Sequence, residues 1–293
     1  MKNNFIKPII AAVIGLIILF AATPATAKAA NADTGPKWFV EISFKNLPSG
    51  ELYATLLSES KSTGPYSADY SHYLECETES QAIKEIDLKF GAYTDKDGFY
   101  YLHNFSKLDD KATFRWGYYP PTKFKILIYS KTEDKFIEND EILERYAFAT
   151  YYAFDIAAGK TVKSYDYFGE IVKLVFRILL TVGIEIAIAL LFKYRGDKLI
   201  FITIVNVVTQ LVLNILLNAI NYRSGWLKMS VLYVVCEMVV FLLESAAYCV
   251  GMRIIENKHE EKHRFFLFHV LYALAANLAS FILGGAFIWL LGM

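Results

Sequence analysis

Polar and ionisable side chains recur inside four long apolar segments of this 293-residue chain. A charged side chain at the centre of a bilayer costs about 2.5–3.5 kcal/mol on insertion scales, so such residues face a bundle interior or a water-filled cavity. The chemistry they offer there is binding of a cation or proton, or positioning of a water. The candidates for such an intramembrane polar site are Glu185, Glu244, His269, Asn206, Glu237, Arg177, Gln210 and Asn277.

The spacing of these residues places them on one face of each segment. Arg177, Thr181 and Glu185 are four residues apart, so they lie on the same side of one helix. An amide recurs every fourth residue in the second segment, at Asn206, Gln210, Asn214 and Asn218. The third and fourth segments carry comparable stripes, Tyr233, Glu237, Glu244 and Tyr248 in one, and His269, Asn277 and Ser280 in the other. Each helix therefore has a polar stripe that must avoid lipid.

A rise of about 1.5 Å per residue sorts these groups by depth. The inner layer is expected to hold Glu185, Glu244, Asn206 and His269, and the outer layer Arg177, Glu237, Gln210 and Asn277. Neighbouring carboxylates bind a cation or share a proton, because two like charges cannot both stay ionised at close range. In the outer layer, Arg177 is expected to neutralise Glu237.

Two other interpretations of the polar stripes stay open. Polar side chains also hold transmembrane helices together, at about 0.6 kcal/mol per hydrogen bond, and a buried histidine such as His269 is more often structural than a ligand. A membrane-embedded hydrolase using the inner Glu and His residues is the lesser alternative. The Glu-Glu-x-x-x-Arg motif of prenyl-protein proteases is absent, as are His-Glu-x-x-His and Gly-x-Ser-x-Gly. The sequence predicts no metal site and identifies no cofactor.

The elements that carry these residues are helices near 171–192, 199–219, 229–251 and 265–291, within a domain of residues 170–293. Each is long enough to cross a bilayer, and the chain is 55% hydrophobic with a mean hydropathy of +0.32. Basic residues gather in the first and third connections, near 193–198 and 252–264. The positive-inside rule therefore predicts that these two loops are cytoplasmic.

The N-terminus predicts export. Residues 1–29 have a basic start, an apolar run from Pro8 to Ala22 and small residues at the cleavage positions, the pattern of a signal peptide; an uncleaved anchor helix is the alternative. Export and the positive-inside rule agree on a multi-pass protein of the cell membrane. Its large N-terminal domain is expected to be extracytoplasmic.

Residues 33–165 show alternating apolar positions such as Val40, Ile42 and Phe44, with turn signals between short segments. A helical spacing interrupts them between Ala82 and Phe90. This pattern predicts a β-sandwich of immunoglobulin-like or similar type with one inserted helix, followed by a four-helix transmembrane bundle. The domain has an excess of acidic residues, which argues against nucleic acid as a partner.

Three aromatic residues in this domain, Trp116, Tyr118 and Tyr119, lie beside the rigid Pro120-Pro121 pair. Exposed, they would form a surface that stacks on a sugar or a peptide; the favoured alternative is that they fill the core at the end of a strand. The segment Asp95-Lys96-Asp97-Gly98 starts like a calcium loop, but the rest of that pattern is missing and a turn is expected.

Several motifs are shared with one family. They are Thr63-Gly-Pro-Tyr-Ser67, Trp116-Gly-Tyr-Tyr-Pro-Pro121, Phe124-Lys-Ile-Leu-Ile-Tyr129, Glu144-Arg-Tyr-Ala-Phe148, Asn206-x-x-Thr209-Gln210-x-x-x-Asn214 and Glu237-x6-Glu244-x3-Tyr248. In these motifs, over nearly the whole mature chain, the sequence resembles a family of predicted Gram-positive membrane proteins that have an exported β-rich domain and four C-terminal transmembrane helices. The resemblance implies an architecture and a compartment. It implies no activity, because the family has none assigned.

The leading hypothesis is a membrane protein whose outer domain senses a ligand and whose bundle handles a cation or proton. The alternatives are a non-enzymatic scaffold or receptor-like subunit with a polar core for helix assembly only, and an intramembrane hydrolase. The expected partners are the lipid bilayer and an extracellular ligand or a partner membrane protein. Four helices are few for a carrier, so transport also predicts a homo-oligomer.

Overall fold

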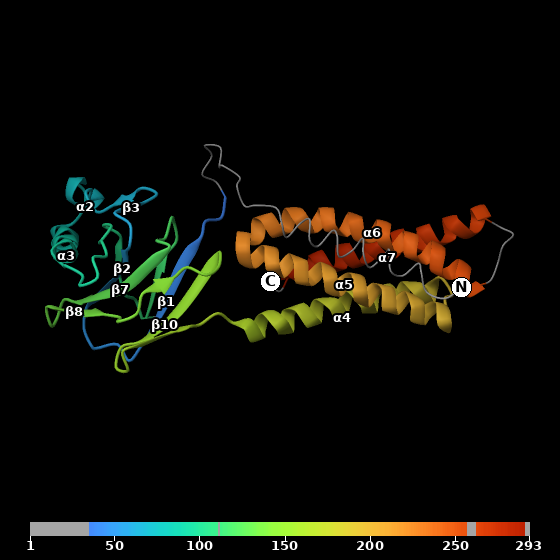
Figure 1. The fold of residues 1–293 in the computed structure, drawn as a ribbon, viewed down its shortest axis with the longest axis horizontal. Coiled ribbons are helices and arrows are strands. Elements are labelled where there is room, and N and C mark those ends of the chain that lie inside the picture. Colours follow the sequence, from blue (N-terminus) through green and yellow to red (C-terminus); the bar gives the residue numbers. More distant parts are fainter. Residues whose placement is uncertain (1–34, 111, 257–261, 291–293) are drawn as a thin grey trace. The chain divides into compact units, whose positions relative to one another are not determined.

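The computed structural model describes residues 35–110, 112–256 and 262–290 (Figure 1). The predicted signal peptide, residues 1–29, lies outside them. The chain divides into two compact units, a β-rich unit of residues 35–165 and a helical unit that begins at Asp166.

The β-rich unit contains two main sheets. One has the order β11-β10-β1-β6, with strands β11 Lys160–Lys163, β10 Ala149–Asp155, β1 Phe39–Lys45 and β6 Thr113–Trp116. The other has the order β5-β2-β7-β8, with strands β5 Phe105–Lys107, β2 Leu52–Ser58, β7 Lys123–Ser130 and β8 Lys135–Glu138, while β9 Leu143–Glu144 also pairs with β7. A short hairpin joins β3 Ser62–Thr63 and β4 Tyr66–Ser67. The β1–β10 pair is parallel, and the other pairs are antiparallel.

The main core of this unit lies between the two sheets. Val40, Ile42 and Phe44 alternate along β1 and point into it, and alternate residues of β2, β6, β7 and β10 meet them. The predicted β-rich domain is thus confirmed as two packed sheets.

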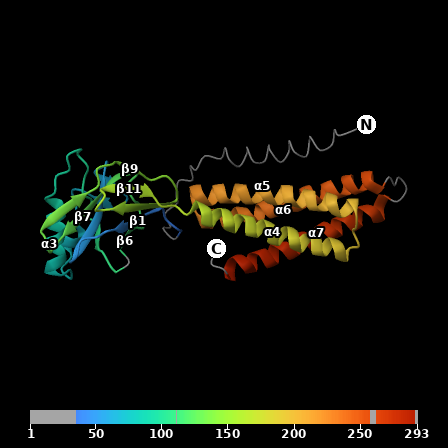
Figure 2. The ribbon, with the colours of Figure 1, turned by 90° about the horizontal axis from the view of Figure 1, so that it is seen from below.

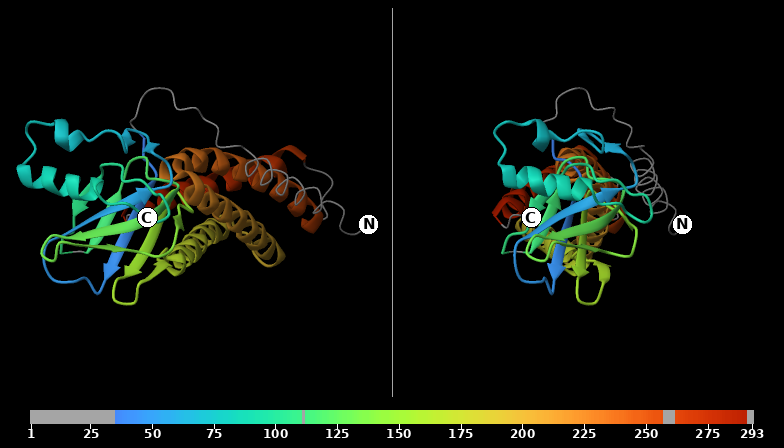
Figure 3. Two further views of the ribbon diagram at one scale, coloured as in Figure 1. Left: turned by 60° about the vertical axis from the view of Figure 1, so that its left-hand side comes forward. Right: turned by 90° about the vertical axis from the view of Figure 1, so that its left-hand side faces the viewer.

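One face of the second sheet is covered by helix α3, Gln81–Gly91 (Figure 3). Ser80 caps the helix by accepting a hydrogen bond from the Ile83 N–H at 3.3 Å. Ile86 and Phe90, one turn apart, pack against the aromatic residues of the sheet. The inserted helix is therefore confirmed, and a short helix, α2 His72–Glu75, precedes it.

The β-rich unit buries two ionic clusters. The ammonium of Lys125 is fully buried and lies 2.6 Å from Asp95 Oδ1, 2.5 Å from Asp97 Oδ2 and 2.7 Å from Glu138 Oε1. Asp87 on α3 accepts hydrogen bonds from three side chains, those of Ser71, Tyr101 and His103, at 2.6 to 3.0 Å. Buried charges persist only when they are paired in this way.

These clusters predict how the β-rich unit responds to acid. Burial raises the pKa of Asp95, but hydrogen bonds from Lys125 and from backbone N–H groups outweigh it and lower the pKa to about 2. Burial likewise raises the pKa of Asp87, and bonds from His103, Ser71 and Tyr101 bring the net pKa below its ordinary value of 3.8. A lowered carboxyl pKa stabilises the fold above the unfolded-state pKa, and the gain is lost as pH falls through the folded-state pKa.

We therefore expect the free energy of unfolding of this unit to hold from neutral pH to about pH 4 and to fall between about pH 4 and pH 2. Tryptophan fluorescence of the full chain in nanodiscs, followed during acid titration, measures it. Asp87→Asn should reduce the loss of unfolding free energy over this pH range. Asp140→Asn, at a side chain that is 86% exposed, should leave that loss unchanged. An identical acid profile for Asp87→Asn and the parent chain would contradict the assignment.

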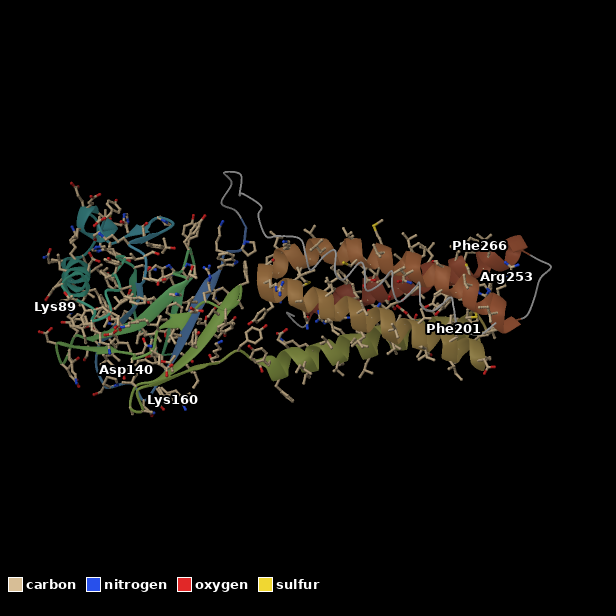
Figure 4. All side chains as sticks on the ribbon, in the orientation of Figure 1. Lys89, Asp140, Lys160, Phe201, Arg253 and Phe266 are labelled. Atoms are coloured by element: carbon tan, nitrogen blue, oxygen red, sulfur yellow. The ribbon has the colours of Figure 1, made fainter. Side chains whose placement is uncertain are left out.

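The helical unit consists of four long helices: α4 Tyr167–Leu191, α5 Asp197–Ser224, α6 Trp226–Glu256 and α7 Lys262–Leu290 (Figure 2). All four are long and apolar enough to cross a membrane. Each helix packs against two neighbours, α4 and α6 both lying between α5 and α7. Phe201, Arg253 and Phe266 gather at the end of the bundle where α4 connects to α5 (Figure 4).

The bundle is apolar outside and polar inside. Large apolar side chains such as Leu179, Ile204 and Met238 are more than half exposed on its outer surface. The polar side chains of Glu185, Asn206 and Glu244 are completely buried. This is the reverse of a water-soluble bundle, and it follows from a hydrocarbon surrounding in which polar groups must find partners inside.

Candidate intramembrane polar site

Two glutamates from opposite helices define the centre of the bundle. Glu185 lies on α4 and Glu244 on α6, both with no exposed surface, and both carboxylates accept hydrogen bonds from α7. Hereafter the two are called the carboxylate pair. Helices α5 and α7, which flank them, supply the hydrogen-bonding groups.

Glu244 is bound at both oxygens. Thr209 of α5 donates its hydroxyl to Oε1 at 2.5 Å, and Asn277 of α7 donates its Nδ2 to Oε2 at 2.7 Å. The same hydroxyl lies 3.0 Å and 3.1 Å from the backbone oxygens of Val205 and Asn206 on its own helix, so its single proton is shared among neighbouring acceptors. The carboxylate thus ties together three helices.

Glu185 is bound at one oxygen only. Ser280 of α7 donates its hydroxyl to Oε1 at 3.1 Å, while Oε2 is buried and has no hydrogen-bond partner. Ser280 and Asn277 are three residues apart and share one face of α7, so a single turn of α7 contacts both members of the pair. No ion pair to either glutamate occurs among residues 35–110, 112–256 and 262–290.

A cluster of tyrosines adjoins the pair. Tyr248, one turn from Glu244 on α6, donates a hydrogen bond to Asn206 Oδ1. Tyr272 donates its hydroxyl to the backbone oxygen of Glu185 at 3.4 Å, and its ring centre is 5.3 Å from that of Tyr248. All three side chains are buried.

His269 lies beyond these tyrosines, toward the α4–α5 connection. Its Nδ1 is 2.5 Å from the hydroxyl of Tyr194, a residue of that connection, and the two rings stack with centres 5.8 Å apart. The ring of Tyr194 also packs edge-on against Tyr272 at 5.0 Å. Hydroxyl and imidazole groups therefore extend from the carboxylate pair toward one end of the bundle.

One prediction of depth and one prediction of pairing need correction. Asn277 was expected in the outer layer, but it binds Glu244; antiparallel helices tilt, and a glutamate side chain reaches about one helical turn, so counting residues misplaces it. Arg177 was expected to neutralise Glu237, but its Nη2 donates to Asn218 Oδ1 at 2.7 Å, while Glu237 is hydrogen-bonded to Tyr233. The amide of Asn218 lies on the neighbouring helix and meets Arg177 first.

Several buried polar atoms near the pair have no hydrogen-bond partner. Among them are two acceptors, Glu185 Oε2 and Asn277 Oδ1, and two donors, Asn206 Nδ2 and Gln210 Nε2. Gln210 Oε1 accepts a long bond from Asn214 at 3.4 Å. Since buried polar atoms are normally bonded, the core has unused capacity for a proton, a water or a small cation.

Three participants in this site were named neither among the sequence candidates nor on the polar stripes. Thr209 lies three residues after Asn206, and Tyr272 three residues after His269, so both fall on the predicted polar stripes. Tyr194 lies in a connection, where helical periodicity gives no signal. The first two were detectable from the spacing, and the third was not.

The aromatic candidates of the β-rich unit differ in their exposure to solvent. Trp116 has no exposed surface, packs in the core and donates its Nε1–H to the backbone oxygen of Tyr118 at 2.9 Å, so it is not part of a ligand surface. The edge of the Tyr66 ring covers it, with centres 5.1 Å apart. Tyr119 is 47% exposed and has a positive φ of 47°.

Within the part of the chain that the structure describes, no group of three His, Cys, Asp or Glu residues is placed to hold a metal ion. No protein-family model, curated protein or solved structure matches this chain. The fold itself defines its class, a β-rich domain joined to four helices with the length and composition of a multi-pass membrane bundle.

Proposed function

We propose that this chain is a cell-membrane protein whose bundle binds and exchanges a proton or a monovalent cation at the carboxylate pair of Glu185 and Glu244. The β-rich unit, a sandwich of immunoglobulin-like or related type, faces the outside of the cell. The basic residues near 193–198 and 252–264 and the signal-peptide pattern of residues 1–29 support this orientation.

One observation carries the proposal: two fully buried carboxylates bind the same turn of α7 and, within the part of the chain that the structure describes, form no ion pair with a basic side chain. Two ionised carboxylates in a low-dielectric core repel each other, and neither recovers its lost hydration. The pair is therefore stable when it holds one proton or one cation.

The hydrogen bonds indicate where the proton resides. Glu244 accepts one donor at each oxygen, an arrangement that stabilises an ionised carboxylate. Glu185 accepts a single bond and leaves Oε2 free, which suits a protonated carboxyl with an O–H to donate. The adjacent tyrosines, with His269 and Tyr194, provide groups that exchange protons toward the α4–α5 end.

Infrared difference spectroscopy of the full chain in nanodiscs tests this assignment. We expect a protonated-carboxyl C=O band at neutral pH that is lost in Glu185→Gln and kept in Glu170→Gln, a glutamate at the start of α4 that pairs with Lys173. If a cation displaces the proton, titration with sodium or potassium should diminish the band. If the pair binds only a proton, the band should change with pH and not with either cation. A parent spectrum without such a band, and without a cation response, would overturn the proposal.

A second candidate role is helix assembly, because Thr209, Glu244 and Asn277 join three helices by hydrogen bonds. Thermal unfolding distinguishes the two roles. Assembly alone predicts that Glu244→Gln and Asn214→Leu lower the melting temperature equally and that neither pH nor cations alter the parent protein. Ion exchange predicts that Glu244→Gln folds but loses the response to pH or cations.

A further inference from the structure

A cavity of about 490 Å³ lies in the β-rich unit, far along the sequence from the helical site. Its polar lining includes three carboxylates, those of Glu59, Asp97 and Glu144, and one ammonium, that of Lys123. The volume falls within the range of small-molecule sites. The charge and shape of its walls decide what kind of molecule it accepts.

Asp97 connects the cavity to the buried lysine cluster. An ammonium has three N–H donors, and Lys125 has three carboxylate partners, Asp95, Asp97 and Glu138. One positive charge therefore faces three negative ones. Lys125 is fully buried and saturated, so it cannot move to neutralise a further group at the cavity.

The carboxylates on the other side are only loosely paired. Lys123 Nζ lies 3.7 Å from Glu59 and 3.9 Å from Glu144, beyond hydrogen-bond distance, and the side chain is 42% exposed. A further basic group, the ammonium of Lys61, lies over the Tyr100 ring, 5.6 Å from its centre. The three lysines leave an excess of negative charge, with acceptors at Glu59 and Glu144 available to a ligand.

The rest of the lining is apolar. Phe99, Tyr100 and Ile142 contribute to the cavity, and Ile142 is 52% exposed although it is a large aliphatic residue. The loop that carries Phe99 is held rigidly, because Asp95 Oδ2 accepts the backbone N–H groups of Asp97 and Phe99, both at 2.9 Å. An apolar wall fixed beside weakly paired carboxylates favours an organic cation over an inorganic one.

We propose that this cavity binds a small organic cation, a primary amine carried on an apolar body. Glu59 and Glu144 accept the ammonium N–H groups, and Tyr100 and Ile142 pack against the apolar part. The site is independent of the carboxylate pair in the bundle, so either assignment stands without the other.

Isothermal titration calorimetry of the full chain in nanodiscs of zwitterionic lipid tests the proposal, with empty nanodiscs as the blank. The probe is 2-phenylethylamine, and its neutral match is 2-phenylethanol. We expect saturable binding of the amine and at least tenfold weaker binding of the alcohol. The double variant Glu59→Gln/Glu144→Gln should bind the amine at least tenfold more weakly and melt at the temperature of the parent protein.

The matched control is Glu77→Gln/Glu133→Gln, which removes the same charge from exposed glutamates that do not line the cavity. This control should bind the amine as the parent does. Three outcomes overturn the proposal: no amine binding by the parent, equal binding of amine and alcohol, or equal weakening in the control, which would indicate attraction by net charge alone. Binding that Ile142→Ser weakens further supports the apolar wall.

Discussion

Replacement of Lys125 by methionine is expected to destabilise the β-rich unit by about 3–5 kcal/mol, the cost of breaking a buried ion cluster from one side. Methionine fills nearly the same volume but carries no charge. Asp95 then stays completely buried with no counter-charge, and Glu138, whose side chain is 16% exposed, loses its counter-charge as well. Chemical denaturation of the full chain in nanodiscs, followed by Trp116 fluorescence, measures the loss; the other tryptophans are replaced by phenylalanine.

The triple variant Lys125→Met/Asp95→Asn/Glu138→Gln is the control for this prediction. It removes the two least exposed of the three carboxylates that lose their counter-charge and keeps Asp97, whose side chain is 44% exposed, so it should recover much of the lost stability. A single variant within about 1 kcal/mol of the parent, the range of an exposed pair, would show that the cluster is not buried in solution.

Glu244→Gln is expected to reduce ion flux by at least tenfold in proteoliposomes that carry a proton or monovalent-cation gradient. The amide keeps the size of the side chain but cannot ionise, so the pair loses the charge that alternates with binding. Glu185→Gln should give the same loss. A fluorescent reporter of internal pH, with a potassium diffusion potential to drive movement, measures the flux.

Glu170→Gln is the matched control, because Glu170 lies in the first turn of α4, the helix of Glu185, and pairs with Lys173 at 3.4 Å. It should retain flux. Equal flux in the parent and both pair variants would overturn transport, and the infrared band would then decide whether the pair only binds a proton. Since four helices provide a single core, transport also predicts a homo-oligomer, which cross-linking in native membranes would detect.

The sequence predicted the four long helices, β1 and α3 well, because their signals are local. Four apolar segments exceed the thickness of the hydrocarbon core, and the helices found there begin and end within several residues of the predicted limits. Alternation along residues 40–44 predicted β1, and the spacing of Ile83, Ile86 and Phe90 predicted α3. Each pattern depends only on the period of one element.

The burial of Trp116 could not be predicted from the pattern of its own segment. Its segment predicted aromatic side chains at a strand end, and both a surface and a core were compatible with that pattern. The second sheet and Tyr66 cover the indole completely. The location of the covering elements is a property of strand order, and strand order is not encoded in the alternation of one strand.

The sequence by itself determined that this chain has four membrane-length helices, that each has a polar stripe, and that a β-rich domain precedes them. Only the tertiary structure decided which polar groups meet: Asn277 with Glu244, Ser280 with Glu185 and Arg177 with Asn218. It also brought Lys125 to Asp95 and Glu138, where the sequence predicted a turn. The reason is physical, since helix periodicity fixes the face of a residue, whereas tilt, register and side-chain reach across neighbouring elements fix its partner.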